Sequence, residues 1–186
     1  MAVNAASIVA SIAAEASPNA KVGLFLRPCE LRAVVELLKL KQVDATSLVL
    51  IGIDCPGTYK AAGFRNTRRA DADFDNKHVR DQSGYAANVN FRTACQLCEY
   101  SKPLVFDLAI GYLGMNPDEE LWVEAATDKG NALLEGVTIT QGKEPAARKQ
   151  ALERLSTARK ARTAERFAEL DKQVMGPEKL VAYYAD

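Results

Sequence analysis

Four cysteines are the residues of this sequence best suited to chemistry, and a single histidine accompanies them. They are Cys29, Cys55, Cys95 and Cys98. Cys95 and Cys98 form a Cys-x-x-Cys pair, whose short turn can direct two thiolates at one metal ion or cluster. Cys55 is followed by a proline that stiffens the backbone, and Cys29 follows another proline. Thiolate sulfur is the soft, anionic ligand that iron–sulfur clusters and zinc bind, so the four cysteines are candidate ligands of one shared site.

The elements expected around these cysteines bring two of them together. Residues 21–26 and 47–54 are apolar runs typical of buried strands, and residues 28–42 carry apolar side chains at helical spacing. A right-handed strand–helix–strand unit places both strand ends at the same edge of a parallel sheet. Because Cys29 follows the first strand and Cys55 the second, we expect these two thiols to lie close together.

The rest of the chain predicts further elements of an α/β fold. Helices are expected over 3–15, 128–135 and 144–172, and strands over 104–110, 121–125 and 137–140. Polar residues dominate a long loop at 56–92. We therefore predict a short, mostly parallel sheet with flanking helices, in an iron–sulfur domain over 1–143. A charged helical extension follows over 144–186, and its thin apolar stripe favours a solvated helix lying against the domain over a connector to a neighbour.

Composition narrows the class of protein. The 24 basic and 24 acidic side chains give no net charge, which argues against a broad nucleic-acid-binding surface. The longest apolar run, 48–53, is far shorter than the about 20 residues of a membrane-spanning helix. No basic residue precedes Lys21, so the start of the chain does not resemble a secretory signal. We expect a cytoplasmic protein, in which thiols are buried, reactive or metal-bound rather than paired in disulfides.

Spacing alone leaves three interpretations of the cysteines open. A shared [4Fe–4S] cluster is favoured, because zinc sites more often use two short cysteine pairs and this chain has one. The second interpretation is a zinc-stabilised interaction module of a larger complex. The third is a thiol-redox protein that uses Cys95 and Cys98 as a dithiol.

Several arginines are candidates for binding the phosphates of a flavin, since guanidinium groups pair well with pyrophosphate. They are Arg27, Arg65, Arg68 and Arg69. The last three lie in a polar loop, where solvated arginines are the simpler interpretation. Arg27 also neighbours Cys29, where it either offsets the charge of a cluster or pairs with a nearby glutamate. The sequence assigns no catalytic residue.

Three segments together carry a resemblance to a known family. The first segment begins Leu26-Arg-Pro-Cys-Glu-Leu-Arg and continues through the expected helix to Gln42. The second is Ile51-Gly-Ile-Asp-Cys-Pro-Gly-Thr-Tyr59, and the third is Arg92-Thr-Ala-Cys-Gln-Leu-Cys-Glu-Tyr100. They resemble the beta-subunit family of deazaflavin-coenzyme (F420) hydrogenases and dehydrogenases, including formate dehydrogenase beta subunits. The residues from 144 onward add little to this likeness.

The resemblance implies an electron-transfer subunit of an anaerobic oxidoreductase of the hydrogenase, formate dehydrogenase or heterodisulfide-reductase type. Such subunits relay electrons between clusters and a flavin, here FAD, and in methanogens on to the deazaflavin coenzyme. The family's cluster cysteines map to Cys29, Cys55, Cys95 and Cys98. Longer members carry a ferredoxin-like segment outside the shared region, so we expect ferredoxin-like or flavin-bearing partner subunits to complete the electron path.

Overall fold

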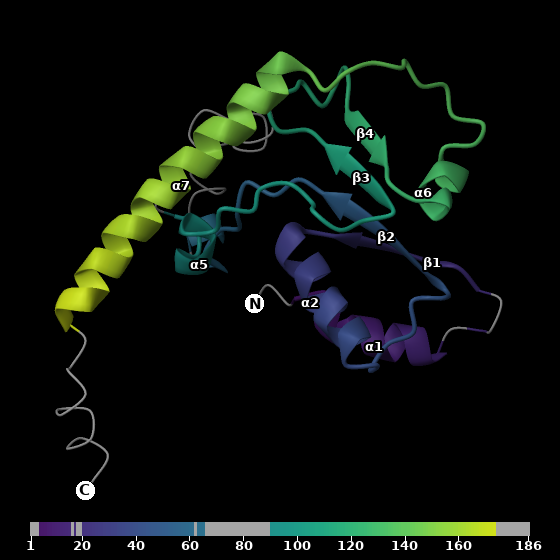
Figure 1. Cartoon of the computed structure of the whole chain (residues 1–186), viewed down its shortest axis with the longest axis horizontal. Coiled ribbons are helices and arrows are strands. Elements are labelled where there is room, and N and C mark those ends of the chain that lie inside the picture. Colours follow the sequence, from purple (N-terminus) through teal and green to yellow (C-terminus); the bar gives the residue numbers. More distant parts are fainter. Residues whose placement is uncertain (1–3, 16, 18–19, 62, 66–89, 174–186) are drawn as a thin grey trace, which may run out of the picture.

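A four-stranded sheet forms the centre of the chain (Figure 1). The computed structural model describes residues 4–15, 17, 20–61, 63–65 and 90–173. The strands, in sheet order, are β1 (Val22–Leu26), β2 (Leu48–Ile53), β3 (Leu108–Gly111) and β4 (Trp122–Ala125). The helices are α1 (Ala6–Glu15), α2 (Pro28–Lys39), α5 (Thr93–Gln96), α6 (Asp128–Leu133) and α7 (Ala146–Gln173). The first three strands run parallel and β4 runs antiparallel to β3, which confirms the mostly parallel α/β fold.

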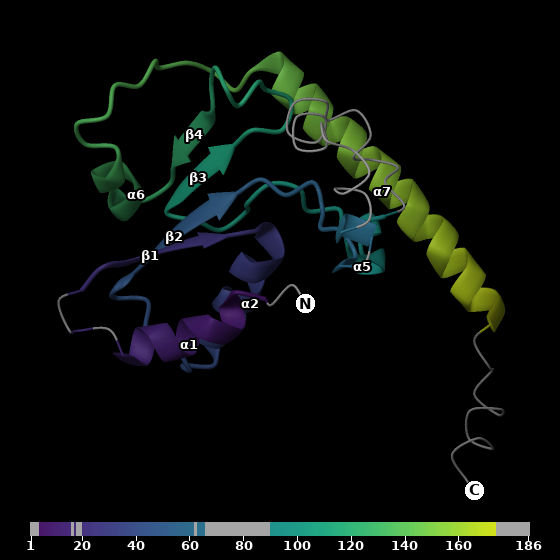
Figure 2. The same ribbon diagram turned by 180° about the vertical axis from the view of Figure 1, so that it is seen from behind.

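Helices cover both faces of the sheet, as the buried strands of a parallel sheet require (Figures 1 and 2). Side chains alternate between the faces along β2. Leu48 packs in the cluster that contains Val9 of α1 and Leu31 of α2. Val49 instead belongs to a second cluster, and Leu134 at the end of α6 packs against that cluster. The β1–α2–β2 unit therefore forms as expected, and its strand ends meet at one edge.

The long helix α7 runs past the carboxyl ends of the parallel strands and extends beyond the body of the chain (Figure 1). Its first half is packed: Leu155 is buried in a cluster with Phe91 and Leu113. Its second half is mostly exposed, and Phe167 leaves 60% of its surface to solvent. The expected apolar stripe thus contacts the domain along only part of its length.

Two expected strands differ from the structure. The strand expected over 137–140 is wrong, because these residues follow a left-handed turn at Gly136 and have no pairing partner in the described residues. The strand expected over 104–110 begins only at Leu108. Residues 104–107 instead form bends that precede the strand. The Asp107 carboxylate there accepts a hydrogen bond of 2.7 Å from the backbone of Leu50.

One helix boundary and one short helix also differ from the expectation. α2 ends at Lys39 rather than residue 42, because Lys41 adopts a left-handed backbone with φ 55°. The four-residue helix α5, inside the cysteine-containing segment, was not expected. Residues 66–89 of the expected loop over 56–92 lie outside the described part of the chain.

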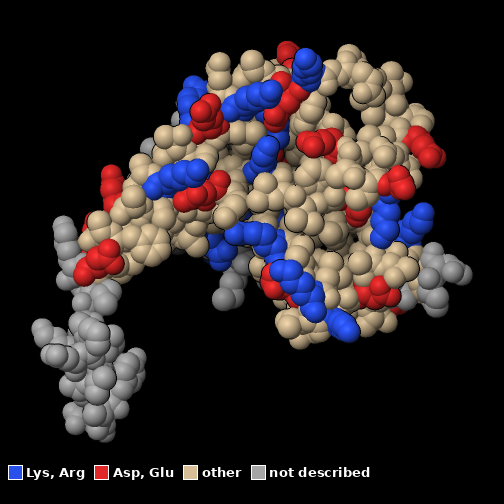
Figure 3. Space-filling view, in the orientation of Figure 1, with Lys and Arg blue, Asp and Glu red and all other residues tan. Residues whose placement is uncertain are grey.

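The surface mixes charges of both signs. Basic and acidic side chains alternate over the sheet domain and along α7 on the face shown in Figure 3. Within the described residues, no helix has both the length and the apolar character needed to cross a membrane.

Candidate functional site

All four cysteines line one cavity of about 530 Å³ at the carboxyl ends of the parallel strands. Cys29 lies in the first turn of α2, and Cys55 lies two residues beyond β2. Cys95 belongs to α5, and Cys98 follows that helix. The expected proximity of Cys29 and Cys55 is therefore found, and the Cys-x-x-Cys pair faces the same cavity. Their role as ligands stays a prediction.

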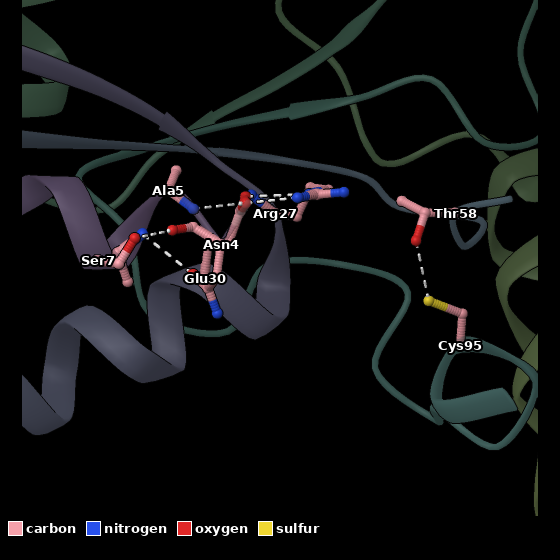
Figure 4. A network of polar contacts seen from close by, with 8 residues as sticks. Asn4, Ala5, Ser7, Arg27, Glu30, Thr58 and Cys95 are labelled. Carbon is pink, nitrogen blue, oxygen red and sulfur yellow. Dashed lines mark hydrogen bonds and ion pairs between the residues drawn. The ribbon is translucent and has the colours of Figure 1, made fainter. Parts of the chain in front are cut away.

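Hydrogen bonds fasten the Cys-x-x-Cys segment to the segment that follows β2. The backbone N–H of Cys55 donates to the carbonyl of Ser101 at 2.8 Å, and that of Arg92 donates to the carbonyl of Thr58 at 2.8 Å. The Thr58 hydroxyl and the Cys95 sulfur lie 3.2 Å apart (Figure 4). Three of the four thiols are thus held by two chain segments that share one hydrogen-bonded framework.

Gly57 shapes the turn that follows Cys55. Its φ of +123° belongs to the region that favours glycine, and a Cβ there would lie 2.6 Å from Cδ2 of Phe91. Phe91 is fully buried and packs edge-on against Tyr59, with ring centroids 4.8 Å apart. The Phe91 ring therefore cannot move aside without opening the packing beneath the cavity.

We expect Gly57→Ala to lower the free energy of unfolding by about 1–3 kcal/mol, because it adds backbone strain to overpacking. Chemical denaturation of both proteins measures this difference. Gly142→Ala is the matched control, since a Cβ at Gly142 meets nothing within 4 Å. Equal stability of the two variants would contradict the strained turn.

A buried glutamate anchors Arg27 beside Cys29. Glu30 is buried and accepts hydrogen bonds from the backbone and Nε of Arg27, at 2.9 and 3.0 Å, and from the backbone of Ala5 (Figure 4). Burial alone would raise the pKa of Glu30, but these hydrogen bonds outweigh it and hold the pKa below its ordinary value. The pairing of Arg27 with a nearby glutamate is confirmed, and Arg27 still lines the cavity.

The thiols influence one another's ionisation. Burial raises the pKa of Cys55 to about 11, although the N–H of Gly57 and the charge of Arg27 oppose the shift. Burial also raises the pKa of Cys29, and negative charge on Cys98 and Cys95 adds to it. Because a bound metal deprotonates a coordinating thiol outright, a metal centre is the kind of group that would turn this cavity into a set of thiolates.

The helix α7 contributes two buried arginines to this edge of the sheet. Arg148 forms a buried ion pair with Asp54, the residue before Cys55. Arg159 is buried and donates to the carbonyl oxygens of Pro56 and Cys98, the latter at 3.0 Å. Both contacts hold the cysteine-bearing segments against α7.

These contacts of α7 were not predicted from the sequence, although a signal for them exists. Arg148 and Arg159 fall at helical spacing on the same side of α7 as Leu152 and Leu155. Counting only the apolar residues therefore underestimates the width of the helix face that contacts the domain. Thr163 lies on the same side of the helix, and its hydroxyl donates to the carbonyl of Leu97 at 3.1 Å.

The remaining arginine predictions have different outcomes. Arg65 is exposed and is not among the described residues that line the cavity. Arg68 and Arg69 lie outside the described residues. Arg32, an arginine of α2 outside this candidate set, lines the cavity, and its guanidinium lies 4.3 Å from the ring centre of Tyr100, in a cation–π contact.

The cavity has room for a group of several atoms. Four thiolates on one zinc ion would lie about 3.8 Å apart, because each Zn–S bond is about 2.3 Å in a tetrahedral site. In the described part of the chain, no three His, Cys, Asp or Glu side chains are grouped in the way that a single ion requires. The four cysteines are among the residues that line a space of about 530 Å³, which is large enough to admit an iron–sulfur cluster.

Comparison with known proteins identifies the family. Residues 19–143 match the C-terminal part of the family described as "Coenzyme F420 hydrogenase/dehydrogenase, beta subunit". The chain belongs to this family. The F420 hydrogenase/dehydrogenase match includes all four cysteines and Asp54, whereas α7 with its two buried arginines lies beyond it.

Two curated proteins of the F420-dependent type are similar over part of the chain. One is the F420-dependent formate dehydrogenase 1 subunit beta of Methanococcus maripaludis, 26% identical over 145 residues. The other is the F420-dependent formate dehydrogenase subunit beta of Methanocaldococcus jannaschii, 26% identical over 139 residues. Each match covers 62% of this chain and 36% of the relative, so the chain spans about a third of the length of these relatives.

Proposed function

We propose that this chain is an electron-transfer subunit of an oxidoreductase complex. In this proposal Cys29, Cys55, Cys95 and Cys98 hold one [4Fe–4S] cluster that passes electrons to or from a flavin. The observation that carries the proposal is that all four cysteines of the sequence line a single cavity. Membership of a hydrogenase/dehydrogenase family supports it independently.

The chain's own residues have distinct roles in this proposal. A cluster held there would supply one-electron redox chemistry. The four cysteines provide its thiolates, and the hydrogen-bonded framework between residues 55–58 and 92–101 fixes three of them. Cys29 is exposed whereas the other three are half-buried, so the side of the cavity at α2 is where a partner centre can approach most closely.

The relatives' names suggest the chemistry of the partners. Both are beta subunits of F420-dependent formate dehydrogenases, which supports a role beside other oxidoreductase subunits. We propose that ferredoxin-like or flavin-bearing subunits are among them. FAD is the proposed flavin, and the deazaflavin coenzyme is the acceptor that the family suggests. Arg65, Arg68 and Arg69 remain candidates for flavin phosphates, and Arg27 reaches the cavity while paired with Glu30.

The test is reconstitution of the purified chain with iron and sulfide without oxygen. We expect about four irons and four sulfides per chain, with the broad visible absorption of an iron–sulfur centre. Cys55→Ser should weaken cluster binding more than about tenfold, seen as a lower iron content, since removing a ligand exceeds the usual outer-shell effect on metal affinity. Flavin is assayed separately, as yellow cofactor released on denaturation.

Glu99→Gln is the matched control, because Glu99 lines the same cavity but has no sulfur. It should keep its iron. A colourless chain with one tightly bound zinc would instead support the zinc-stabilised interaction module. A metal-free chain with a readily formed Cys95–Cys98 disulfide would support the thiol-redox alternative.

A further inference from the structure

Arg159 is the largest fully buried side chain in the described part of the protein, with 1% of its surface exposed. It comes from α7, beyond the residues that match the family. Long cationic side chains are almost never fully buried unless they are paired, because burying an isolated charge is costly. Its position therefore needs a compensating partner.

The hydrogen bonds of Arg159 join the two cysteine-bearing segments. Nη2 donates to the carbonyl of Pro56, directly after Cys55. Nη1 donates to the carbonyl of Cys98 at 3.0 Å and to the hydroxyl of Ser101 at 3.2 Å. One guanidinium thus links the segments that carry Cys55 and Cys98, and its planar fork suits this task better than a lysine ammonium.

No carboxylate offsets this charge in the described residues, where the ion pairs of α7 involve Arg148 and Arg166 instead. The hydrogen bonds of Arg159 reach the carbonyl of Cys98 and the carbonyl of Pro56, directly after Cys55. Negative charge on a group held by Cys55 and Cys98 would therefore lie close to the guanidinium.

One nitrogen of the Arg159 guanidinium has no hydrogen-bond partner among the described residues. This nitrogen is Nε, and it is buried. Buried polar groups are nearly always paired, and an exception in the lining of a cavity indicates a missing acceptor. A thiolate-held cluster has sulfur acceptors, and hydrogen bonds and charge near such sulfurs tune the cluster's potential.

We propose that Arg159 is the positioning residue and counter-charge of the cysteine site, so that α7 completes a site whose thiols all lie in the family-matched region. This inference rests on the proposed cluster. It makes two separable claims. The fork of the guanidinium keeps the segments of Cys55 and Cys98 at the spacing that retains the cluster, and its positive charge stabilises the reduced, more negative form.

The experiment compares Arg159→Gln, Arg159→Lys and the control Arg154→Gln, whose arginine is exposed on the same helix. The readouts are iron lost to a chelator over time, the midpoint potential of the reconstituted cluster and the thermal unfolding of the metal-free chain. We expect Arg159→Gln to lose iron more than about tenfold faster than wild type and to shift the potential to a more negative value. Arg159→Lys should lose iron faster but keep the potential closer to that of wild type.

The outcomes separate this inference from the proposed function. If the wild-type chain binds no iron–sulfur cluster, both are overturned. If wild type binds the cluster and Arg159→Gln matches Arg154→Gln in iron retention and potential, only the role of Arg159 is overturned. If Arg159→Gln does not fold, the lysine variant decides: faster iron loss at an unchanged potential supports the inference, and unchanged iron loss overturns it.

Discussion

Replacing Arg148 with methionine is expected to lower the free energy of unfolding by about 3–5 kcal/mol, because it leaves the buried Asp54 carboxylate without its cation. Both side chains are almost fully buried, and the guanidinium bonds both carboxylate oxygens. The backbone N–H groups of Tyr112 and Leu113 also donate to Asp54, each at 3.0 Å. They satisfy the oxygens in part but do not neutralise the charge.

A double variant makes this prediction specific to charge. Asp54→Asn keeps an acceptor for the two N–H groups and removes the charge, so adding it to Arg148→Met should restore part of the lost stability. Urea denaturation of the wild type, both single variants and the double variant completes the cycle. Additive losses across the cycle would mean that the two side chains do not act as a pair.

The effect should reach the cysteine site, because Asp54 directly precedes Cys55 and Arg148 anchors α7. Gly111 shows how tightly the pair is enclosed, since a Cβ there would overlap the Arg148 guanidinium. Arg148→Met should therefore also speed the loss of iron to a chelator. Arg154→Met, at an exposed position of the same helix, should change stability by no more than about 0.5 kcal/mol.

The β1–α2–β2 unit was predictable from sequence because its signals are local. Apolar runs mark both strands, and the spacing of Leu31 and Val34 marks the buried face of α2. The right-handed crossover of such a unit then places Cys29 and Cys55 at the same edge of the sheet, and this inference needs no side-chain contact. The expectation failed at residues 137–140, where β-branched residues have no strand to pair with in the described residues, since pairing is a tertiary property.

The contribution of α7 could not be derived in the same way. Its contacts with the cysteine segments are separated by 58 to 103 residues along the chain. They also use arginines, which a hydrophobic pattern counts as solvated positions. The sequence was therefore enough to predict that cysteines gather at one edge of the sheet. The positions of the buried arginines around them could be found only from the three-dimensional structure.

Leu155→Ala is expected to lower the free energy of unfolding by about 2–5 kcal/mol, whereas Phe167→Ala should change it by no more than about 0.5 kcal/mol. Both residues belong to the apolar stripe that the sequence predicts for the C-terminal helix. Leu155 is buried against Phe91 and Leu113, and its loss leaves a cavity. Phe167 is 60% exposed, and nothing comparable is lost when it is shortened.

The same pair of variants tests whether the packing of α7 supports the cysteine site. Cys95 and Tyr59 pack against the cluster that contains Leu155, so a cavity there loosens the support beneath one proposed ligand. Leu155→Ala should therefore release iron faster from the reconstituted chain, while Phe167→Ala releases it at the wild-type rate. If both variants released iron at the same rate despite a large difference in stability, α7 would hold the fold without holding the site.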